Sequence, residues 1–232
     1  MDMDTKLTVL DQLKGHLIVS CQALPDEPLH SSFIMSKMAY AAMLGGAKGI
    51  RANSIEDIRA IKKEVDLPII GIIKAVYENS NVHITPTRKE IDLLVEEGVE
   101  IIALDATKRM RPDGKRISEL FPDIRNQYKN QLFMADCSTY EEACEAYRLG
   151  FDCIGTTLSG YTSYTKDVHL PNVSLLERLV EELPVPIIAE GGIWSPEQLK
   201  QCFRAGIHAA VVGTAITRPM DITKRFVNAI KN

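Results

Sequence analysis

The chain has 232 residues, of which 45% are hydrophobic and 25% charged, an ordinary composition for a globular protein. Its 27 basic and 31 acidic side chains leave a net charge of −4, which does not favour a nucleic-acid-binding protein. No apolar run approaches the roughly 20 residues that a membrane span needs, so we expect no membrane contact.

The cysteines and the first residues indicate a cytoplasmic protein. The number of cysteines is odd, their spacing is wide, and no CxxC motif occurs. This pattern is typical of reduced thiols and not of a disulfide framework or a zinc site. Residues 1–6 are polar and acidic, which is not typical of a secretory signal.

Eight short apolar runs rich in Ile and Val recur along the chain, each bounded by turn residues. Runs of this length with many β-branched side chains predict buried parallel strands. The predicted strands are residues 16–21, 48–51, 68–74, 100–105, 131–136, 153–157, 186–190 and 209–213.

Amphipathic stretches between these runs predict helices. Residues 54–65 begin at a candidate N-cap serine, and residues 87–97 carry an apolar side. Residues 139–149 begin with the spacing of a capping box and stop at Gly150. Residues 195–205 place Pro196 at the first helical position, and residues 221–230 form a last helix. Three further helices are less sharply bounded.

Eight strand–helix units without a dividing linker predict one domain over residues 1–232. The average unit of about 29 residues suits a single-domain (β/α)₈ TIM barrel of the α/β class. An open doubly wound sheet is the alternative, and a GxGxxG loop after the first strand would favour it. The first strand instead ends in Ser20-Cys21-Gln22-Ala23.

Two charged residues at predicted strand ends are candidates for proton transfer. Side chains alternate along a strand, so Lys74 shares a face with Ile72, and Glu190 shares one with Ile188. Each would point into the mouth of the barrel from strands that lie opposite each other. Two such groups can invert a carbon stereocentre next to a carbonyl, since one removes the proton and the other returns it from the far side. A salt-bridged lysine and a turn-capping glutamate are the alternative interpretations.

Other polar strand ends suit the binding of a substrate. Gln22, Arg51 or Asp136 could hold oxygens and stabilise a developing enolate. The glycines at 191–192 and at Gly213 follow the seventh and eighth strands, where such barrels often bind phosphate. Arg218 adds a positive charge beside the second loop.

The remaining polar features have less specific interpretations. The histidines are scattered, so the strand ends do not resemble a metal site. Residues 161–164 form a polar loop or a mobile lid at the mouth, and their position favours a lid. Residues 109–116 are a basic turn, for which a solvated loop is favoured over a nucleic-acid site, and which could steer an anionic substrate.

The chain resembles the N-acylmannosamine-6-phosphate 2-epimerase family in segments that run from the first predicted strand to the eighth. The segments are VSCQA (19–23), GIRAN (49–53), GIIK (71–74), ALDAT (103–107), MADCS (134–138), AEGG (189–192) and VGTAITRP (212–219). The last motif alone occurs in many phosphate-binding barrels, but the combination is specific.

This resemblance implies the interconversion of N-acetylmannosamine 6-phosphate and N-acetylglucosamine 6-phosphate in bacterial sialic acid breakdown. It implies a small sugar phosphate as the only substrate, no cofactor, no metal, and a possible homodimer. Lys74 would be the base at C2 and Glu190 the acid that reprotonates it. The remaining roles that it implies are sugar contacts from Gln22, Arg51 and Asp136, and phosphate contacts from Arg218 and the amides near Gly192 and Gly213.

Two other functions remain open from the sequence. An aldolase-like lyase would use Lys74 to form a Schiff base with its substrate. A non-catalytic barrel would bind a sugar phosphate without needing charged groups on opposite faces.

Overall fold

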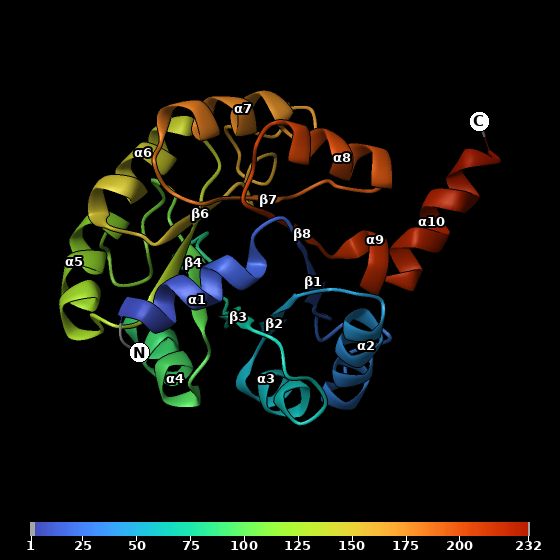
Figure 1. The fold of residues 1–232 in the computed structure, drawn as a ribbon, viewed down its shortest axis with the longest axis horizontal. Helices are drawn as coiled ribbons and strands as arrows, with labels where there is room; N and C mark the ends of the chain where they lie inside the picture. Colours follow the sequence, from blue (N-terminus) through green and yellow to red (C-terminus); the bar gives the residue numbers. More distant parts are fainter. Residues whose placement is uncertain (1–2, 232) are drawn as a thin grey trace.

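The computed structural model describes residues 3–231, so the first two residues of the polar N-terminal segment lie outside the described residues. Eight parallel strands form a closed barrel in chain order (Figure 1). The strands are β1 (Leu17–Cys21), β2 (Gly49–Asn53), β3 (Ile69–Ile72), β4 (Ile101–Asp105), β5 (Leu132–Asp136), β6 (Cys153–Gly155), β7 (Ile187–Glu190) and β8 (Ala209–Val212). Because β8 pairs with β1, the predicted (β/α)₈ barrel is confirmed and the open sheet is excluded.

Helices surround the barrel, and three of them depart from the repeating unit. The repeat helices are α2 (Ser32–Leu44), α3 (Ile55–Lys62), α4 (Arg88–Glu97), α5 (Ile117–Gln127), α6 (Tyr140–Leu149), α7 (Val173–Glu182) and α8 (Pro196–Arg204). The others are α1 (Met3–Leu13), which precedes the first strand, the short α9 (Thr214–Thr217) and α10 (Pro219–Ala229). None of the helices within residues 3–231 has the length and apolarity needed to cross a bilayer.

The predicted caps set where several helices begin and end. The Thr139 side chain accepts a hydrogen bond from the Glu142 amide, and Gly150 ends the helix with a φ of 87°. Ser195 makes the equivalent bond to Gln198 at the start of α8. These local signals hold each helix at a defined distance from the preceding strand, which fixes the loops at the barrel mouth.

Alternate side chains of the strands fill the barrel, while the intervening ones pack beneath the helices. Ile70 and Ile72 belong to the inner cluster, which also contains Val9 and Leu13 of α1. The α1 helix therefore closes the N-terminal end of the barrel, and Figure 1 shows it lying across that end. Polar strand ends are left to form the opposite mouth.

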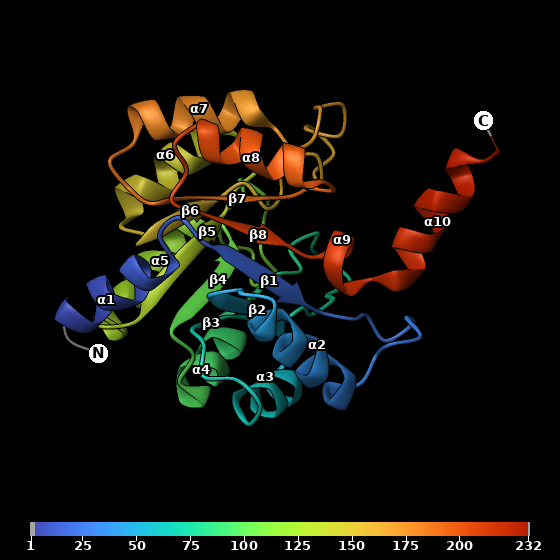
Figure 2. The same cartoon turned by 45° about the vertical axis from the view of Figure 1, so that its right-hand side comes forward.

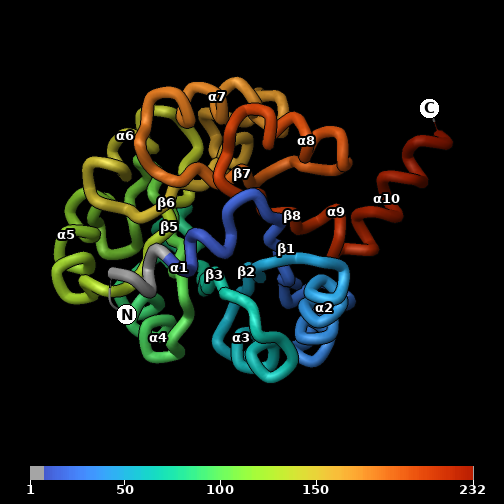
Figure 3. The backbone as a smooth tube through the Cα atoms, viewed as in Figure 1, coloured from blue at the N-terminus to red at the C-terminus, as the bar shows by residue number. Residues whose placement is uncertain are grey.

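After β8 the chain passes through α9, which stays beside the barrel, and continues outward as α10, as the chain trace in Figure 3 shows. Figures 1 and 2 both show α10 projecting away from the other helices. None of its described side chains is buried. The eighth unit thus does not end in a helix packed on its own barrel, in contrast to the regular pattern predicted from the sequence.

Two predicted strands end two residues earlier than expected. The β3 strand stops at Ile72, two residues before Lys74, and β6 stops at Gly155. Lys74 instead forms an isolated antiparallel bridge with Ile84. Its backbone N–H donates to Asn53 Oδ1 at 2.7 Å, which fixes the lysine beside the end of β2.

Candidate active site

The C-terminal mouth of the barrel holds a cavity of about 800 Å³. Its walls come from strand ends and the loops that follow them, where barrels of this kind place their active sites. Six of the eight predicted site residues line it: Gln22, Lys74, Glu190, Gly192, Gly213 and Arg218. The other two, Arg51 and Asp136, are not among its lining residues.

Lys74 has an amine that is easier to deprotonate than an ordinary lysine. Burial lowers its pKa from 10.5 to about 8, and the positive charges of Arg218 and Arg51 act in the same direction. Glu190 and Glu27 oppose the shift. About a tenth of such amines are neutral at pH 7, so Lys74 is equipped to act as a base.

Glu190, at the end of β7, has a carboxyl whose pKa is shifted upward. Burial raises the pKa of its carboxyl from 4.5 to about 7; Arg51 opposes this change and Asp136 reinforces it. Glu190 Oε2 lies 3.1 Å from Arg51 Nη1 and 3.2 Å from Thr157 Oγ1. A carboxyl with this pKa exists in both protonation states near neutral pH, so it can donate or accept a proton.

Lys74 and Glu190 approach the same cavity from opposite sides of the barrel. In the closed strand order, β3 and β7 are four strands apart in either direction. The two side chains also interact electrostatically, because the charge of each shifts the pKa of the other. A molecule held between them would have one ionisable group on either side.

Arg51 and Asp136 form a buried ion pair beneath Glu190. Arg51 Nη1 and Nη2 donate to the two carboxylate oxygens of Asp136 at 3.1 and 2.6 Å. Burial disfavours the Arg51 charge, but Asp136 and Glu190 outweigh burial and raise the pKa of its guanidinium. The pair thus supports the cavity floor, and direct contact of either residue with substrate stays a prediction.

The glycine loop after β7 has a left-handed backbone, whereas Gly213 after β8 has a φ of −111°. Gly191 and Gly192 have φ values of 106° and 71°, which side chains rarely adopt. A Cβ atom on Gly192 would lie 2.3 Å from Leu170 Cβ, so the loop has no room for one. These glycines allow the backbone to approach a bound group closely.

Gly213 and Arg218 lie on the neighbouring part of the cavity wall. Gly213 precedes α9, where Thr217 Oγ1 donates to the Ser20 carbonyl at 2.7 Å and ties the loop to β1. Arg218 Nη2 lies 3.3 Å from Glu27 Oε2. The guanidinium of Arg218 and the backbone at Gly213 therefore lie on the same cavity wall.

Gln22 lies at the end of β1 with its side chain directed by a neighbour. Its Nε2 donates to Ser20 Oγ at 2.7 Å, and both residues line the cavity. The amide oxygen and the second amide hydrogen remain available to polar groups in the cavity. Gln22 thus occupies the place expected of a substrate contact, a role that stays a prediction.

The interpretation of residues 109–116 as a solvated loop is wrong for its first part. Arg111 is buried and donates to the carbonyl oxygens of Pro86, Asp105 and Thr85 at 2.9, 2.6 and 2.7 Å. Arg109 lines the cavity and pairs with Asp105. Only the tertiary fold reveals these roles, because a basic turn at the surface has the same residue pattern.

The predicted lid, residues 161–164, is partly held in place. Tyr161 lines the cavity and is 59% exposed, whereas Thr162 is buried and bonded to Thr165 at 2.7 Å. Lys108 Nζ lies 4.0 Å from the ring centroid of Tyr164. The segment is anchored around an exposed Tyr161, and movement of the segment stays a prediction.

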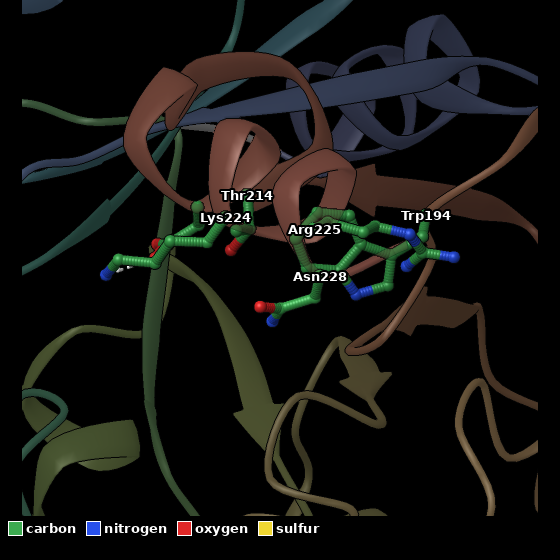
Figure 4. Close-up of a pocket in the computed structure, with 6 residues that line it drawn as sticks. Trp194, Thr214, Lys224, Arg225 and Asn228 are labelled. Atoms are coloured by element: carbon green, nitrogen blue, oxygen red, sulfur yellow. Dashed lines mark hydrogen bonds and ion pairs between the residues drawn. The ribbon is translucent and has the colours of Figure 1, made fainter. Parts of the chain in front are cut away.

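A second, more open hollow of about 490 Å³ adjoins the first (Figure 4). Trp194 and Thr214 line both. The guanidinium of Arg225, on α10, lies 4.8 Å from the centroid of a ring of Trp194. The projecting helix is thereby in contact with the loop that follows Gly191 and Gly192.

No cluster of three or more His, Cys, Asp or Glu side chains suited to a metal ion occurs within residues 3–231. The arginines and the lysine of the cavity are also poor metal ligands. Proton transfer by the side chains themselves is the chemistry that this set of residues favours.

Comparison with known proteins places this geometry in a family. A family model described as "Putative N-acetylmannosamine-6-phosphate epimerase" matches residues 35–232. The chain belongs to this epimerase family. It is 54% identical to a relative from Caldanaerobacter subterraneus over 226 residues, covering 97% of this chain and 95% of the relative. A relative from Clostridioides difficile is 56% identical over 223 residues, 96% of this chain and 99% of the relative. Both carry the name "Putative N-acetylmannosamine-6-phosphate 2-epimerase".

Solved structures agree with this membership. The structure of the N-acetylmannosamine-6-phosphate 2-epimerase from Clostridium perfringens matches with a TM-score of 0.90 and 55% identity, covering 95% of each chain. Thiamine phosphate pyrophosphorylase from Pyrococcus furiosus matches with a TM-score of 0.61 at 16% identity, covering 93% of this chain and 92% of that chain. The second similarity concerns the fold alone.

Proposed function

We propose that the protein interconverts N-acetylmannosamine 6-phosphate and N-acetylglucosamine 6-phosphate in amino sugar breakdown. The observation that carries the proposal is the pair of Lys74 and Glu190, on opposite sides of one cavity, with pKa values of about 8 and about 7. The two sugars differ only in configuration at C2. Their interconversion therefore requires a proton to leave one face and another to arrive at the opposite face, without a change of oxidation state.

The proposed reaction begins from the open-chain aldehyde, because the ring form lacks the carbonyl that makes the C2 proton acidic. The neutral amine of Lys74 removes the C2 proton, and the electron pair moves into an enolate. Protonated Glu190 then delivers a proton to the opposite face of C2. The reverse direction uses the Glu190 carboxylate as the base and the Lys74 ammonium as the acid.

The phosphate would bind on the side of Gly192, Gly213 and Arg218. Positive-φ glycines present backbone amides, and a guanidinium makes charge-assisted hydrogen bonds to phosphate oxygens. Gln22 would contact the sugar. Arg51 and Asp136 would affect the reaction by holding the Glu190 carboxyl in place, besides any direct contact with the sugar. Binding energy from a phosphate remote from C2 is then used to place C2 between the two proton-transfer groups.

The protein is further proposed to act in the cytoplasm as a homodimer. Ile222, Phe226 and Ile230 follow one another at four-residue spacing along α10, and Phe226 and Ile230 are 72% and 86% exposed. An exposed apolar stripe on a projecting helix is typical of a surface that another chain covers. A second copy is the occupant that a homodimer supplies, with α10 packed on the partner barrel.

The test is to incubate the purified protein with N-acetylmannosamine 6-phosphate and follow both epimers by ¹H NMR. The proposal predicts N-acetylglucosamine 6-phosphate as the sole product, formed without added cofactor. A cleavage product, or a substrate adduct trapped on Lys74 by borohydride, would instead establish the lyase. Binding without any conversion would establish a non-catalytic barrel.

A further inference from the structure

Thr157 follows β6 and lies between the two carboxyl groups of the site. Its Oγ1 is 2.6 Å from Asp136 Oδ1 and 3.2 Å from Glu190 Oε2. A threonine hydroxyl has a single proton, so it can donate to only one of these oxygens at a time.

The same two oxygens share a second donor. Arg51 Nη1 lies 3.1 Å from Asp136 Oδ1 and 3.1 Å from Glu190 Oε2. Asp136 is additionally fixed by Arg51 Nη2, whereas Oε1 of Glu190 has no hydrogen-bond partner among the described residues. Glu190 is therefore held from below through one oxygen, and the other is left for the cavity.

We propose that Thr157 is a positioning residue for Glu190: its hydroxyl, shared between Asp136 and Glu190, fixes Oε2 of the carboxylate and so presents Oε1 to the substrate. When Glu190 is a carboxylate, the hydroxyl donates to Oε2. When Glu190 is protonated, the hydroxyl donates to Asp136, the ion-pair partner of Arg51, while Arg51 Nη1 still donates to Oε2 and the proton stands on Oε1. The inference rests on the proposed epimerase function, in which Glu190 must alternate between these two states.

The neighbouring residue, Thr156, contacts the backbone of Glu190 and not its carboxyl group. Thr156 Oγ1 donates to the Glu190 carbonyl at 2.9 Å and accepts from the Glu190 amide at 3.2 Å. Thr156 thus ties the backbone of β7 to β6, and Thr157 alone of the two contacts the carboxyl group. A substitution at each position separates backbone support from control of the carboxyl.

The effect on protonation has a defined sign. The charged and titratable groups that face Glu190 are Arg51 from β2, Lys74 after β3, Asp136 from β5 and Tyr161 after β6. Thr157 adds a neutral donor that stabilises the carboxylate and lowers the Glu190 pKa. Thr157→Val removes the donor while keeping the side-chain shape, so the pKa of Glu190 rises further above its ordinary value.

The experiment is a pH titration by ¹³C NMR of protein labelled at the glutamate side-chain carboxyl carbon. The Glu190 signal is assigned by its loss in Glu190→Gln. We expect its midpoint to move up by about half a unit to one unit in Thr157→Val and to return in Thr157→Ser, because one hydrogen bond to a charged group is lost and restored. Thr156→Val should leave the midpoint in place, whatever its effect on rate.

An unchanged Glu190 midpoint in Thr157→Val, or a shift of equal size in Thr156→Val, would overturn the proposal. If the valine variant does not fold, Thr157→Ala carries the same test. The titration does not require turnover, so it can fail or succeed independently of the proposed function, which fails if the wild-type protein does not convert the sugar phosphate. Given turnover, Thr157→Val should lower kcat about tenfold with KM changed less than about threefold, since positioning acts on the transition state.

Discussion

Lys74 and Glu190 begin from ordinary pKa values of 10.5 and 4.5 and reach about 8 and about 7 in the barrel mouth. Burial is the largest cause in both cases, and it acts in opposite directions because it disfavours an ammonium and a carboxylate alike. The remaining difference of about one unit corresponds to about 1.4 kcal/mol. Two groups so closely matched suit a reversible reaction in which each must serve as acid and as base.

The pH dependence of the reaction follows from these two values. Below about pH 7 both groups hold their protons and no base is available; above about pH 8 both have lost them and no acid remains. We expect kcat/KM to follow a bell with limbs near pH 7 and pH 8 and a maximum near pH 7.5 in both directions. A profile that stays flat across these limbs would contradict the assignment of the pair.

The buried ion pair of Arg51 and Asp136 predicts a large effect on stability. Asp136→Asn leaves the Arg51 charge buried with a weaker partner, and breaking such a pair costs about 3–5 kcal/mol. The free energy of unfolding, measured in urea, should fall by this amount. Glu64→Gln, which removes an exposed ion pair with Lys37, serves as the control and should cost less than about 1 kcal/mol. Equal losses in the two variants would contradict the account of the floor.

At this scale the sequence identified the residues but not their pairing. The alternation of side chains along β7 was enough to place Glu190 in the mouth, because Ile188 is buried in the inner cluster. Lys74 also lies in the mouth, but beyond the end of β3, where its amide is held by Asn53. The contact between Arg51 and Asp136 joins residues 85 positions apart, and no local pattern encodes it. Thr157 was likewise unassigned, since its significance depends on both carboxyl groups being near it.

The loop after β7 depends on glycine for the position of its backbone. Gly192→Ala adds a Cβ 2.3 Å from Leu170 Cβ at a φ of 71°. The loop must therefore move, and we expect the KM for the sugar phosphate to rise at least about tenfold, because the proposed phosphate site uses the loop amides.

Gly114→Ala is the matched control for Gly192→Ala. Gly114 has a similar φ of 76°, but nothing lies within 4 Å of the added Cβ. This variant should lose about 1–2 kcal/mol of stability from the backbone strain alone and keep its KM. Steady-state kinetics on both variants decides the matter, and an unchanged KM in Gly192→Ala would remove the loop from the phosphate site.

Elements with strong local signals were predicted best from the sequence. The capping box predicted at Thr139 is formed, because its hydrogen bonds lie within four residues, and Thr87 and Ser195 form capping boxes of the same kind. The turn at 109–116 was misinterpreted, since burial of Arg111 depends on carbonyl groups of the distant segment at Thr85 and Pro86. Long-range contacts of this kind determine whether a charged residue is solvated.

At the scale of the whole molecule, closure of the barrel brings strands that are four apart in chain order to opposite sides of one cavity. The order of eight strands places β3 across from β7, and this step could be anticipated from the repeat of strands and helices alone. The departure of α10 could not be anticipated, because its amphipathic pattern suits packing on its own barrel and on another chain equally well.

The exposed stripe of α10 predicts a dimer that charge would separate. Phe226→Asp together with Ile230→Asp would bury two charges in the proposed interface, so this variant should sediment as a 25.8 kDa monomer. The unmodified protein should sediment at about twice that mass. Tyr147→Asp, on the exposed side of α6, is the control and should not change the mass. A monomeric wild-type protein would contradict the assignment of this surface.

The most direct measurement of the central claim is the fate of the C2 hydrogen in deuterium oxide. For the wild-type protein, NMR should show deuterium at C2 of both sugar phosphates as they interconvert. Glu190→Gln should exchange this hydrogen in N-acetylmannosamine 6-phosphate alone, and Lys74→Met in N-acetylglucosamine 6-phosphate alone, because each variant keeps one base and loses the acid on the other face. Interconversion that leaves C2 free of deuterium, or exchange of both epimers by either variant, would contradict the account.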